Sequence, residues 1–341
     1  MEKITIRKPD DFHVHLRSGD LLEAVAPYTA AHFKRALVMP NTRPNPILTA
    51  EDAMRYKEQI FKALKNKNRT FEPLMTIQIT DNTTGKMIYE AKEAGVIAGK
   101  IYPAGVTTNS DNGITDFDSA NFKSVLCAMR DAGMVLCVHG EDPGVSSLKK
   151  EDVFIDTIMK GIVRCFPRLK IVFEHITTLK AVEFVLNAPE NVAATITVHH
   201  LFLTLDDVIG EKLQPHHFCK PIAKTSLDRD ILRSAAMSGN PKFFLGTDSA
   251  PHSKMNKECH HGAAGVFTAP VALPLLAVLF EEYGGLDQLE KFASINGAQF
   301  YGLPLNEEKI TLIKRPWEAP IICDDYTVPF KAGQQLAWQV Y

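Results

Sequence analysis

The sequence lacks an excess of charge of either sign and contains few cysteines. Its 341 residues carry 38 Lys and Arg against 40 Asp and Glu, a formal net charge of −2. Without a basic field there is no long-range attraction for nucleic acid or anionic lipid, so we expect neither as a partner. The six cysteines form no Cys-x-x-Cys pair, which favours reduced thiols in a cytoplasm over a disulfide framework.

Long apolar runs are also scarce. The chain opens with no apolar signal segment, and only 263–280 runs for eighteen residues without a charge. That stretch contains Gly265, Thr268, Pro270 and Pro274, so a buried helix entered through a proline-broken turn explains it better than a membrane span. We therefore expect a cytoplasmic protein without a membrane partner.

What the chain does contain is an alternation of short β-rich runs and amphipathic stretches, which predicts parallel strands joined by crossover helices. Eight strands are expected to end near His15, Met39, Ile79, Tyr102, His139, His175, Thr197 and Asp248. Helical stretches are expected at 50–65, 83–94, 119–132, 151–165, 179–186 and 227–238, with Thr49 and Thr178 as N-caps of two of them. The pattern predicts an α/β protein, a (β/α)8 TIM barrel.

The last part of the chain changes character. From about residue 304, extended segments are expected at 310–314, 321–323 and 336–341, with Pro316 and Pro320 between them. We interpret this part as a short C-terminal extension packed on the barrel, so that residues 1–341 form a single domain.

Residues able to bind a metal follow several of the predicted strands. His13 and His15 have the spacing that points both side chains to one face of a strand. Lys100, His139, His175 and Asp248 end four other strands. A single histidine there is more often structural, but the carboxyl ends of all eight strands meet at one mouth. Together these residues predict a metal site.

Other histidines are assigned differently. His199 and His200 follow the seventh predicted strand and could line the mouth, but they are not assigned to metal. The remaining histidines fall in predicted helices or loops and are expected to be solvated; they are His32, His216, His217, His260 and His261.

Lys100 needs an explanation, because a free ammonium group is costly to bury in an apolar strand beside divalent cations. Nearby cations depress the pKa of a lysine and favour the neutral amine. A neutral amine can add carbon dioxide to give a carbamate, an anionic ligand with two oxygens. Such a group can bridge two metal ions as a carboxylate does.

From about residue 7 to the end, the chain resembles the dihydroorotase family, most closely its short bacterial type, within the amidohydrolase superfamily. The motifs that carry the resemblance are Phe12-His13-Val14-His15-Leu16-Arg17, Met39-Pro40-Asn41-Thr42, Lys100-Ile101-Tyr102-Pro103-Ala104, Val138-His139-Gly140-Glu141, Glu174-His175-Ile176-Thr177-Thr178 and Gly246-Thr247-Asp248-Ser249-Ala250-Pro251-His252.

The resemblance implies interconversion of N-carbamoyl-L-aspartate and (S)-dihydroorotate plus water in pyrimidine (UMP) synthesis. It implies two Zn2+ per subunit: His13 and His15 on one, His139 and His175 on the other, N6-carboxylated Lys100 bridging them, and Asp248 completing the first site. A hydroxide shared by the two metals would attack the ring, and Asp248 would act as general base and then acid. The resemblance also suggests a homodimer.

The resemblance implies substrate contacts as well. Arg17, Asn41 and His252 would hold the substrate carboxylate, and the backbone near Lys220 and Ala264 would bind the ring amides. The family often has leucine where Lys220 stands, so this chain departs from the pattern there. Thr107 and Thr108 resemble the two threonines of a mobile loop that closes over the substrate. His15 would also face the substrate.

Three alternatives remain open at this point. A hydantoinase or allantoinase would share the six metal ligands but would not explain Arg17, Asn41 and His252 together, because hydantoins carry no ring carboxylate. A mononuclear deaminase would not need Lys100. A non-catalytic homologue that keeps the barrel as a scaffold typically loses ligands, and every ligand is present here.

Overall fold

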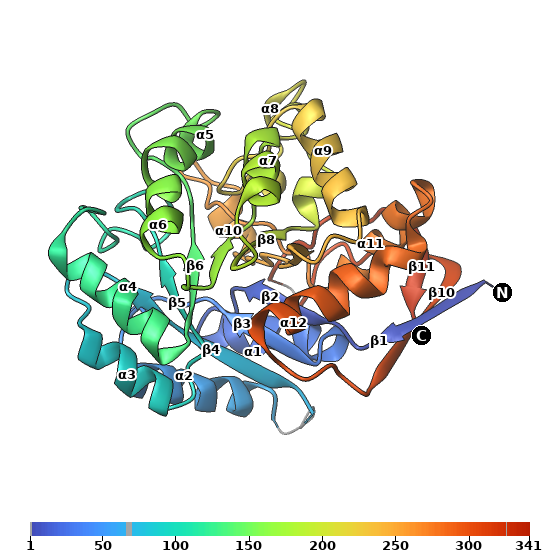
Figure 1. Ribbon diagram of the computed structural model, residues 1–341. Helices are drawn as coiled ribbons and strands as arrows, with labels where there is room; N and C mark the ends of the chain where they lie inside the picture. The colour runs from blue at the N-terminus through green and yellow to red at the C-terminus, as the bar shows by residue number, and fades with distance from the viewer. Residues whose placement is uncertain (1, 66–69, 325) are drawn as a thin grey trace.

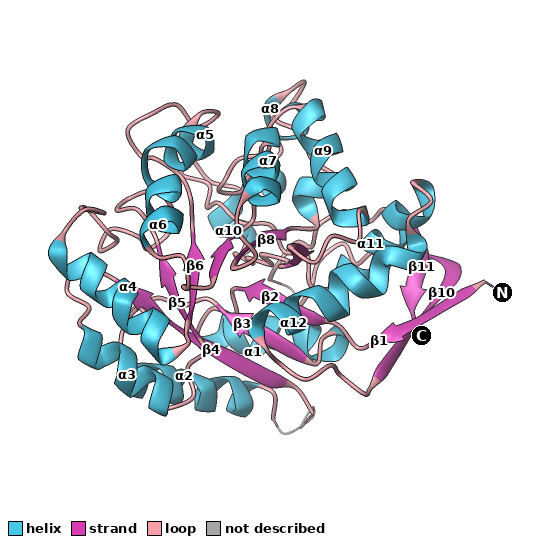
Figure 2. Cartoon of the chain, in the orientation of Figure 1, coloured by secondary structure: helices cyan, strands magenta, loops and turns pink. Residues whose placement is uncertain are grey.

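The computed structural model describes residues 2–65, 70–324 and 326–341. Eight parallel strands follow one another in chain order around a barrel (Figures 1 and 2). The first and last of them meet through a bridge between Val14 and Ser249, beside a hydrogen bond of 2.8 Å from the Asp248 amide to the His13 carbonyl. The predicted (β/α)8 barrel is therefore confirmed. Its strands are β2 (Asp10–Val14), β3 (Arg35–Val38), β4 (Glu72–Ile79), β5 (Ala98–Ile101), β6 (Val135–Val138), β7 (Ile171–Phe173), β8 (Val192–Ile196) and β9 (Phe243–Leu245).

Helices cover the outside of the barrel (Figure 2). The α-helices are α1 (Gly19–His32), α2 (Ala50–Ala63), α3 (Gly85–Glu93), α4 (Ala120–Ala132), α5 (Lys150–Phe154), α6 (Lys160–Cys165), α7 (Leu179–Asn187), α8 (Asp206–Ile209), α9 (Ser226–Met237), α10 (Lys254–Lys257), α11 (Ala272–Glu282) and α12 (Asn296–Tyr301). Helical segments of other types are the π-helices η1 (Ile155–Met159) and η5 (Lys291–Ile295) and the 3-10 helices η2 (His199–Leu201), η3 (Pro215–His217) and η4 (Leu286–Gln288).

Two of the predicted helix starts are confirmed by their caps. The Thr49 side chain accepts a hydrogen bond from the Asp52 amide, and Asp52 bonds back to the Thr49 amide, which completes a capping box. Thr178 caps α7 by accepting from the Ala181 amide. These bonds satisfy amide donors that a helix N-terminus otherwise leaves unpaired.

The amino end of the barrel is filled with apolar side chains. Phe12 stacks on Tyr301 of α12 with ring centroids 4.8 Å apart, and meets Phe244 edge to face at 5.4 Å. Val172 and Ala193 belong to the same buried cluster. Because this end is packed with side chains, polar chemistry is confined to the opposite end, where the strands finish.

The C-terminal segments form a second, smaller sheet. β10 (Lys309–Glu318) lies between β1 (Lys3–Arg7) and β11 (Gln335–Val340), antiparallel to both. Figure 1 shows this sheet at one side of the molecule, next to α11. The extended segments expected near 310–314 and 336–341 are confirmed, and Pro316 lies inside β10 where its register to β11 shifts.

One expectation about this region needs correction. Residues 321–323 do not form a strand; Cys323 instead closes a tight turn by exchanging backbone hydrogen bonds with Thr327. The pairing of the N-terminal segment was not anticipated at all. The apolar stretch 263–280 contributes most of α11, which is buried over nearly its whole length. Within the described residues, no helix has the length and apolarity that crossing a membrane requires.

Candidate metal centre and substrate pocket

His13, His15 and Asp248 converge at the mouth of the barrel. The Asp248 Oδ1 atom lies 3.0 Å from His15 Nε2 and 3.5 Å from His13 Nε2. Burial alone would raise the pKa of Asp248, but the hydrogen bond to His15 and the field of His13 hold that pKa well below its usual value. Burial lowers the pKa of His15 to about 4. A neutral imidazole beside an ionised carboxylate is ready to bind a cation.

His139 and His175 form a second pair next to the first. His139 Nδ1 lies 3.2 Å from His175 Nε2, and the rings of His13 and His175 meet edge to face with centroids 4.9 Å apart. Burial lowers the pKa of both His139 and His175, which favours neutral rings. Tetrahedral zinc with Zn–N bonds near 2.0–2.1 Å separates two nitrogen ligands by about 3.3 Å. The His139–His175 distance fits a shared metal ion.

Lys100 lies in β5 and is fully buried, close enough to His139 and His175 for its charge to contribute to the lowered pKa of both rings. Its Nζ atom has no hydrogen-bond partner anywhere in the described chain. Desolvation lowers the pKa of the Lys100 ammonium, against the opposing fields of Glu174, Cys137 and Asp248. A buried, unpaired amine is unfavourable as it stands, so this side chain fits a modified form that takes part in metal binding.

Several carboxylates behind the histidines were not assigned from the sequence. Glu174 Oε2 lies 2.8 Å from His13 Nδ1 and accepts a hydrogen bond of 2.6 Å from Thr195. Glu141 Oε2 lies 2.8 Å from His139 Nε2. Carboxylates of this kind fix the tautomer and the direction of a ligating ring. The signal was present in the motifs, since Glu141 and Glu174 each stand within two positions of a predicted ligand.

Four residues of the site hold a backbone conformation that only glycine adopts readily. The φ angles are 62° at Arg17, 56° at Asn109, 41° at His175 and 44° at Asp248. Non-glycine residues in this region cost energy that the surrounding structure must hold in place, and they concentrate at functional sites. His175 lies two positions after the end of β7 and Asp248 three positions after the end of β9, so in both cases the turned backbone belongs to the loop at the mouth.

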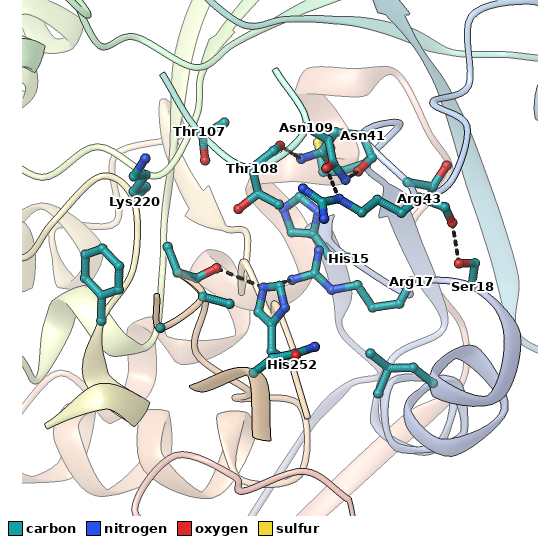
Figure 3. Close-up of a pocket in the computed structure, with 18 of the residues that line it drawn as sticks. His15, Arg17, Ser18, Asn41, Arg43, Thr107, Thr108, Asn109, Lys220 and His252 are labelled. Atoms are coloured by element: carbon teal, nitrogen blue, oxygen red, sulfur yellow. Dashed lines mark hydrogen bonds between the residues drawn. The ribbon is translucent and has the colours of Figure 1, made fainter. Parts of the chain in front are cut away.

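A cavity of about 630 Å³ opens at the mouth of the barrel, and of the candidate metal ligands His15 lies in its wall. Its wall includes every residue assigned to substrate from the sequence: His15, Arg17, Asn41, Thr107, Thr108, Lys220, His252 and Ala264. Figure 3 shows Arg17 between His15 and His252, with Thr107 and Thr108 on the other side of the cavity. The structure thus brings all of them to one place.

Arg17 is held from two directions. Its Nε atom donates to the Pro251 carbonyl at 2.8 Å, and its Nη2 atom lies 3.1 Å from His252 Nε2. Burial, followed by the charge of Arg17, lowers the pKa of His252 far below its usual value, so the ring is neutral. A fixed guanidinium at the wall of a cavity is suited to an anionic, planar group such as a carboxylate.

The loop that contains Thr107 and Thr108 is hydrogen-bonded to Asn41, another residue of the cavity wall. The Asn41 side chain donates to the Thr108 carbonyl at 3.0 Å, and the Asn109 side chain donates to the Asn41 carbonyl at 2.9 Å (Figure 3). Asn109 also accepts from Arg43. These bonds use the backbone of Thr108 and leave both threonine hydroxyls at the cavity wall.

Lys257 is a further residue that the sequence did not single out. It is buried, and its Nζ atom donates to the carbonyls of Phe218, Ala263 and Gly265 at 3.0, 2.8 and 2.7 Å. Desolvation lowers its pKa to about 8. The ammonium group therefore ties together the two segments that present Lys220 and Ala264 to the cavity. In a polar stretch such as 252–261, a lysine gives no local signal that it is buried.

Comparisons with known proteins agree with this geometry. The model of the amidohydrolase family matches residues 10–317. The chain is 48% identical to a dihydroorotase of Aromatoleum aromaticum over 347 aligned positions, which cover 100% of both chains. A solved dihydroorotase from Campylobacter jejuni superposes with a TM-score of 0.92 at 43% identity, over 99% of this chain and 97% of the other. The dihydroorotase of Saccharomyces cerevisiae, solved in complex with 5-fluoroorotic acid, gives 0.92 at 36% identity, over 100% and 99%. Metal dependence is typical of this family. The chain therefore belongs to the amidohydrolase family and, within it, to the dihydroorotases.

Proposed function

We propose that the protein interconverts N-carbamoyl-L-aspartate and (S)-dihydroorotate plus water, the ring-closing reaction of de novo pyrimidine synthesis. The observation that carries the proposal is that Arg17 and His15 line one cavity, and that His15 clusters with His13 and Asp248 at the mouth of the barrel. A cyclic amide with a ring carboxylate can place its anionic group on the guanidinium and its reacting carbonyl over the cluster. The Saccharomyces cerevisiae relative was solved with 5-fluoroorotic acid, which is consistent with an acidic ring ligand.

The cofactor that fits the candidate ligands at the mouth of the barrel is a pair of zinc ions. His13, His15 and Asp248 would hold one ion, His139 and His175 the other, and N6-carboxylated Lys100 would bridge them. The short distances within each group and the unpaired Lys100 amine support this donor set. When bound, a zinc pair activates water at neutral pH and polarises the attacked carbonyl.

Asp248 is placed to move the proton of the reaction. Its low pKa keeps the carboxylate ionised at neutral pH, so it can accept the proton of the attacking water and deliver it to the departing ring nitrogen. In the opposite direction the same oxygen takes the proton from that nitrogen as the ring closes. Glu174 and Glu141 keep His13 and His139 oriented and do not reach the cavity.

Removal of the substrate carboxylate should reveal the role of Arg17. A hydrogen bond between charged groups is worth about 1.5–3 kcal/mol, so dihydrouracil, the same ring without the carboxylate, should be hydrolysed with a kcat/KM at least about tenfold lower than dihydroorotate. Arg17→Met should erase most of this preference while the metal content stays unchanged. Side-by-side kcat/KM values for the two rings in both proteins measure it.

Arg55→Met is the matched control, because Arg55 is exposed on α2 and pairs with Asp52 outside the cavity. This variant should keep the preference of the native protein. If the native protein hydrolyses dihydrouracil or a hydantoin as fast as dihydroorotate, the function is that of a general cyclic amidase.

The loop above the cavity should act on turnover and not on metal binding. Thr107→Ala combined with Thr108→Ala removes both hydroxyls but keeps the backbone bond from Asn41 to the Thr108 carbonyl. We expect a lower kcat with full zinc content, because a closed loop excludes water and positions the bound ring. Steady-state kinetics and metal analysis on the same preparation provide the test.

Thr115→Ala is the control for the loop, since the Thr115 hydroxyl donates to Asp81 and does not face the cavity. It should leave kcat unchanged. Full activity of the double variant, or loss of its zinc, would show that the loop is not a lid.

Three broader expectations belong with this proposal. Residues 1–341 act as a single domain in which the part after about residue 304 is an extension of the barrel. The protein works as a homodimer on a small-molecule substrate, without nucleic acid. Its compartment is the cytoplasm, and the free state of all six cysteines is consistent with a reducing environment.

A further inference from the structure

We propose that His199, His200 and Cys219 form an additional zinc site, separate from the metal pair proposed above. His199 and His200 lie in the turn η2, just beyond the carboxyl end of β8, and Cys219 lies on the segment that leads to Lys220. All three side chains are buried. One ligand atom of each lies within 4.8 Å of one ligand atom of both others.

Two of the three distances around Cys219 and His200 are those of a tetrahedral site, and the third is slightly shorter. Cys219 Sγ lies 3.5 Å from His200 Nε2, and the Pro221 carbonyl oxygen lies 3.0 Å from that nitrogen and 3.3 Å from the sulfur. Zinc bonds of 2.0–2.3 Å in tetrahedral arrangement separate neighbouring ligands by about 3.3–3.6 Å. Cys219, His200 and the Pro221 carbonyl can therefore supply three corners with only small shifts, and His199 supplies the fourth.

The buried ring of His199 lacks a partner among the described residues, and a bound ion would supply one. Its ring is fully buried, and neither Nδ1 nor Nε2 has a hydrogen-bond partner in the part of the chain that is described. The buried His13 and His139 each face a carboxylate at 2.8 Å, so an unpaired ring is exceptional in this protein. Buried polar atoms without partners are unfavourable and point to an unseen ion or water.

The donor atoms of His199, His200 and Cys219 favour zinc. A thiolate with two imidazoles is a soft to intermediate donor set, which zinc prefers over calcium or magnesium. Burial lowers the pKa of His199 to about 4 and raises that of the Cys219 thiol to about 12. The rings are thus neutral and able to bind, whereas the thiol loses its proton only when the cation arrives. Binding of Zn2+ should release one proton from Cys219.

The consequence of binding concerns the cavity wall. Cys219 precedes Lys220, which lines the cavity, and the other two ligands belong to the end of a barrel strand. An ion here would fasten the wall segment to the barrel. The site shares no ligand with the metal pair, so its occupancy can be measured independently of turnover.

Cobalt provides a specific readout, because only this site contains sulfur. The full-length protein, stripped with a chelator and reloaded with Co2+, should show a near-ultraviolet absorption band from sulfur-to-cobalt charge transfer. The ligands of the metal pair are nitrogen and oxygen and cannot produce that band. The zinc-loaded protein should contain one metal ion per chain more than Cys219→Ser.

Two variants and one control complete the test. Cys219→Ser should abolish the band, and His199→Gln should keep it but shift the cobalt titration at least tenfold to higher concentration, which also covers the case in which the serine variant does not fold. Cys323→Ser removes a buried thiol near Tyr28 and should change nothing. Absence of the band in the native protein at saturating cobalt, or its survival in Cys219→Ser, overturns the site. An unchanged titration in His199→Gln would do the same. Loss of dihydroorotase activity bears only on the proposed function, and the charge-transfer band only on this site.

Discussion

Lys100→Ala should empty the metal centre and abolish turnover in the same protein. Among the residues described, Lys100 is buried and its amine is unpaired, and its charge acts on both His139 and His175. If a carbamate on that amine bridges two ions, alanine removes the bridging anion. The two cations would then repel each other in a buried site of low dielectric constant. Metal content and kcat, determined on one preparation, give the result.

A short carboxylic acid added to the alanine variant should restore part of both metal binding and activity, because it can occupy the volume of the missing side chain and offer the same two oxygens. Lys242→Ala is the matched control. This lysine precedes β9 and is also buried, but its amine donates to the carbonyls of Val185 and Ala188 at the end of α7. It should keep the metals. An alanine variant at position 100 that retains both metals and normal turnover contradicts the carbamate.

Asp248→Ala should lower kcat by several orders of magnitude while the ion on His139 and His175 stays bound. Proton transfer by a positioned group contributes about 10²–10⁴-fold. The loss of a ligand beside His13 and His15 adds to that, since Asp248 Oδ1 lies 3.0 Å from His15 Nε2. Single-turnover kinetics with metal analysis separate the two contributions.

Asp10→Asn serves as the control for this position. Asp10 is equally buried but pairs with Arg35 at the amino end of β2, at the opposite end of the barrel. It should affect thermal stability and leave kcat of the folded protein intact. Near-normal turnover in Asp248→Ala would exclude Asp248 as the base.

The barrel and the position of its site were predictable because both leave local marks in the sequence. Each strand is a short apolar run with a polar residue such as His139 or Asp248 at or just after its end, and parallel strands bring these ends together. The spacing of His13 and His15 shows directly that they share a face. The two caps at Thr49 and Thr178 were equally visible, because capping residues act within three positions.

The remaining features depend on contacts that no local pattern contains. The environment of Lys257 is made by carbonyls of Phe218, Ala263 and Gly265, and two of these belong to a loop whose path is set by the tertiary fold. His199 was placed near the mouth but not recognised as buried and unpaired, because burial depends on the packing of the segment around Cys219. The partners Glu141 and Glu174 were within the motifs, but their roles follow only from the side-chain distances.

The small sheet at the side of the barrel has a consequence for how the protein folds while it is being synthesised. Thr5 of β1 pairs with Thr311 of β10, 306 positions later in the chain. β1 is therefore translated about three hundred residues before the strand with which it pairs. Closing so long a loop adds little to the thermodynamic cost, because that cost grows only with the logarithm of length, but it delays the step. While the barrel between them is being synthesised, β1 has no partner strand, and an unpaired strand can pair with another chain.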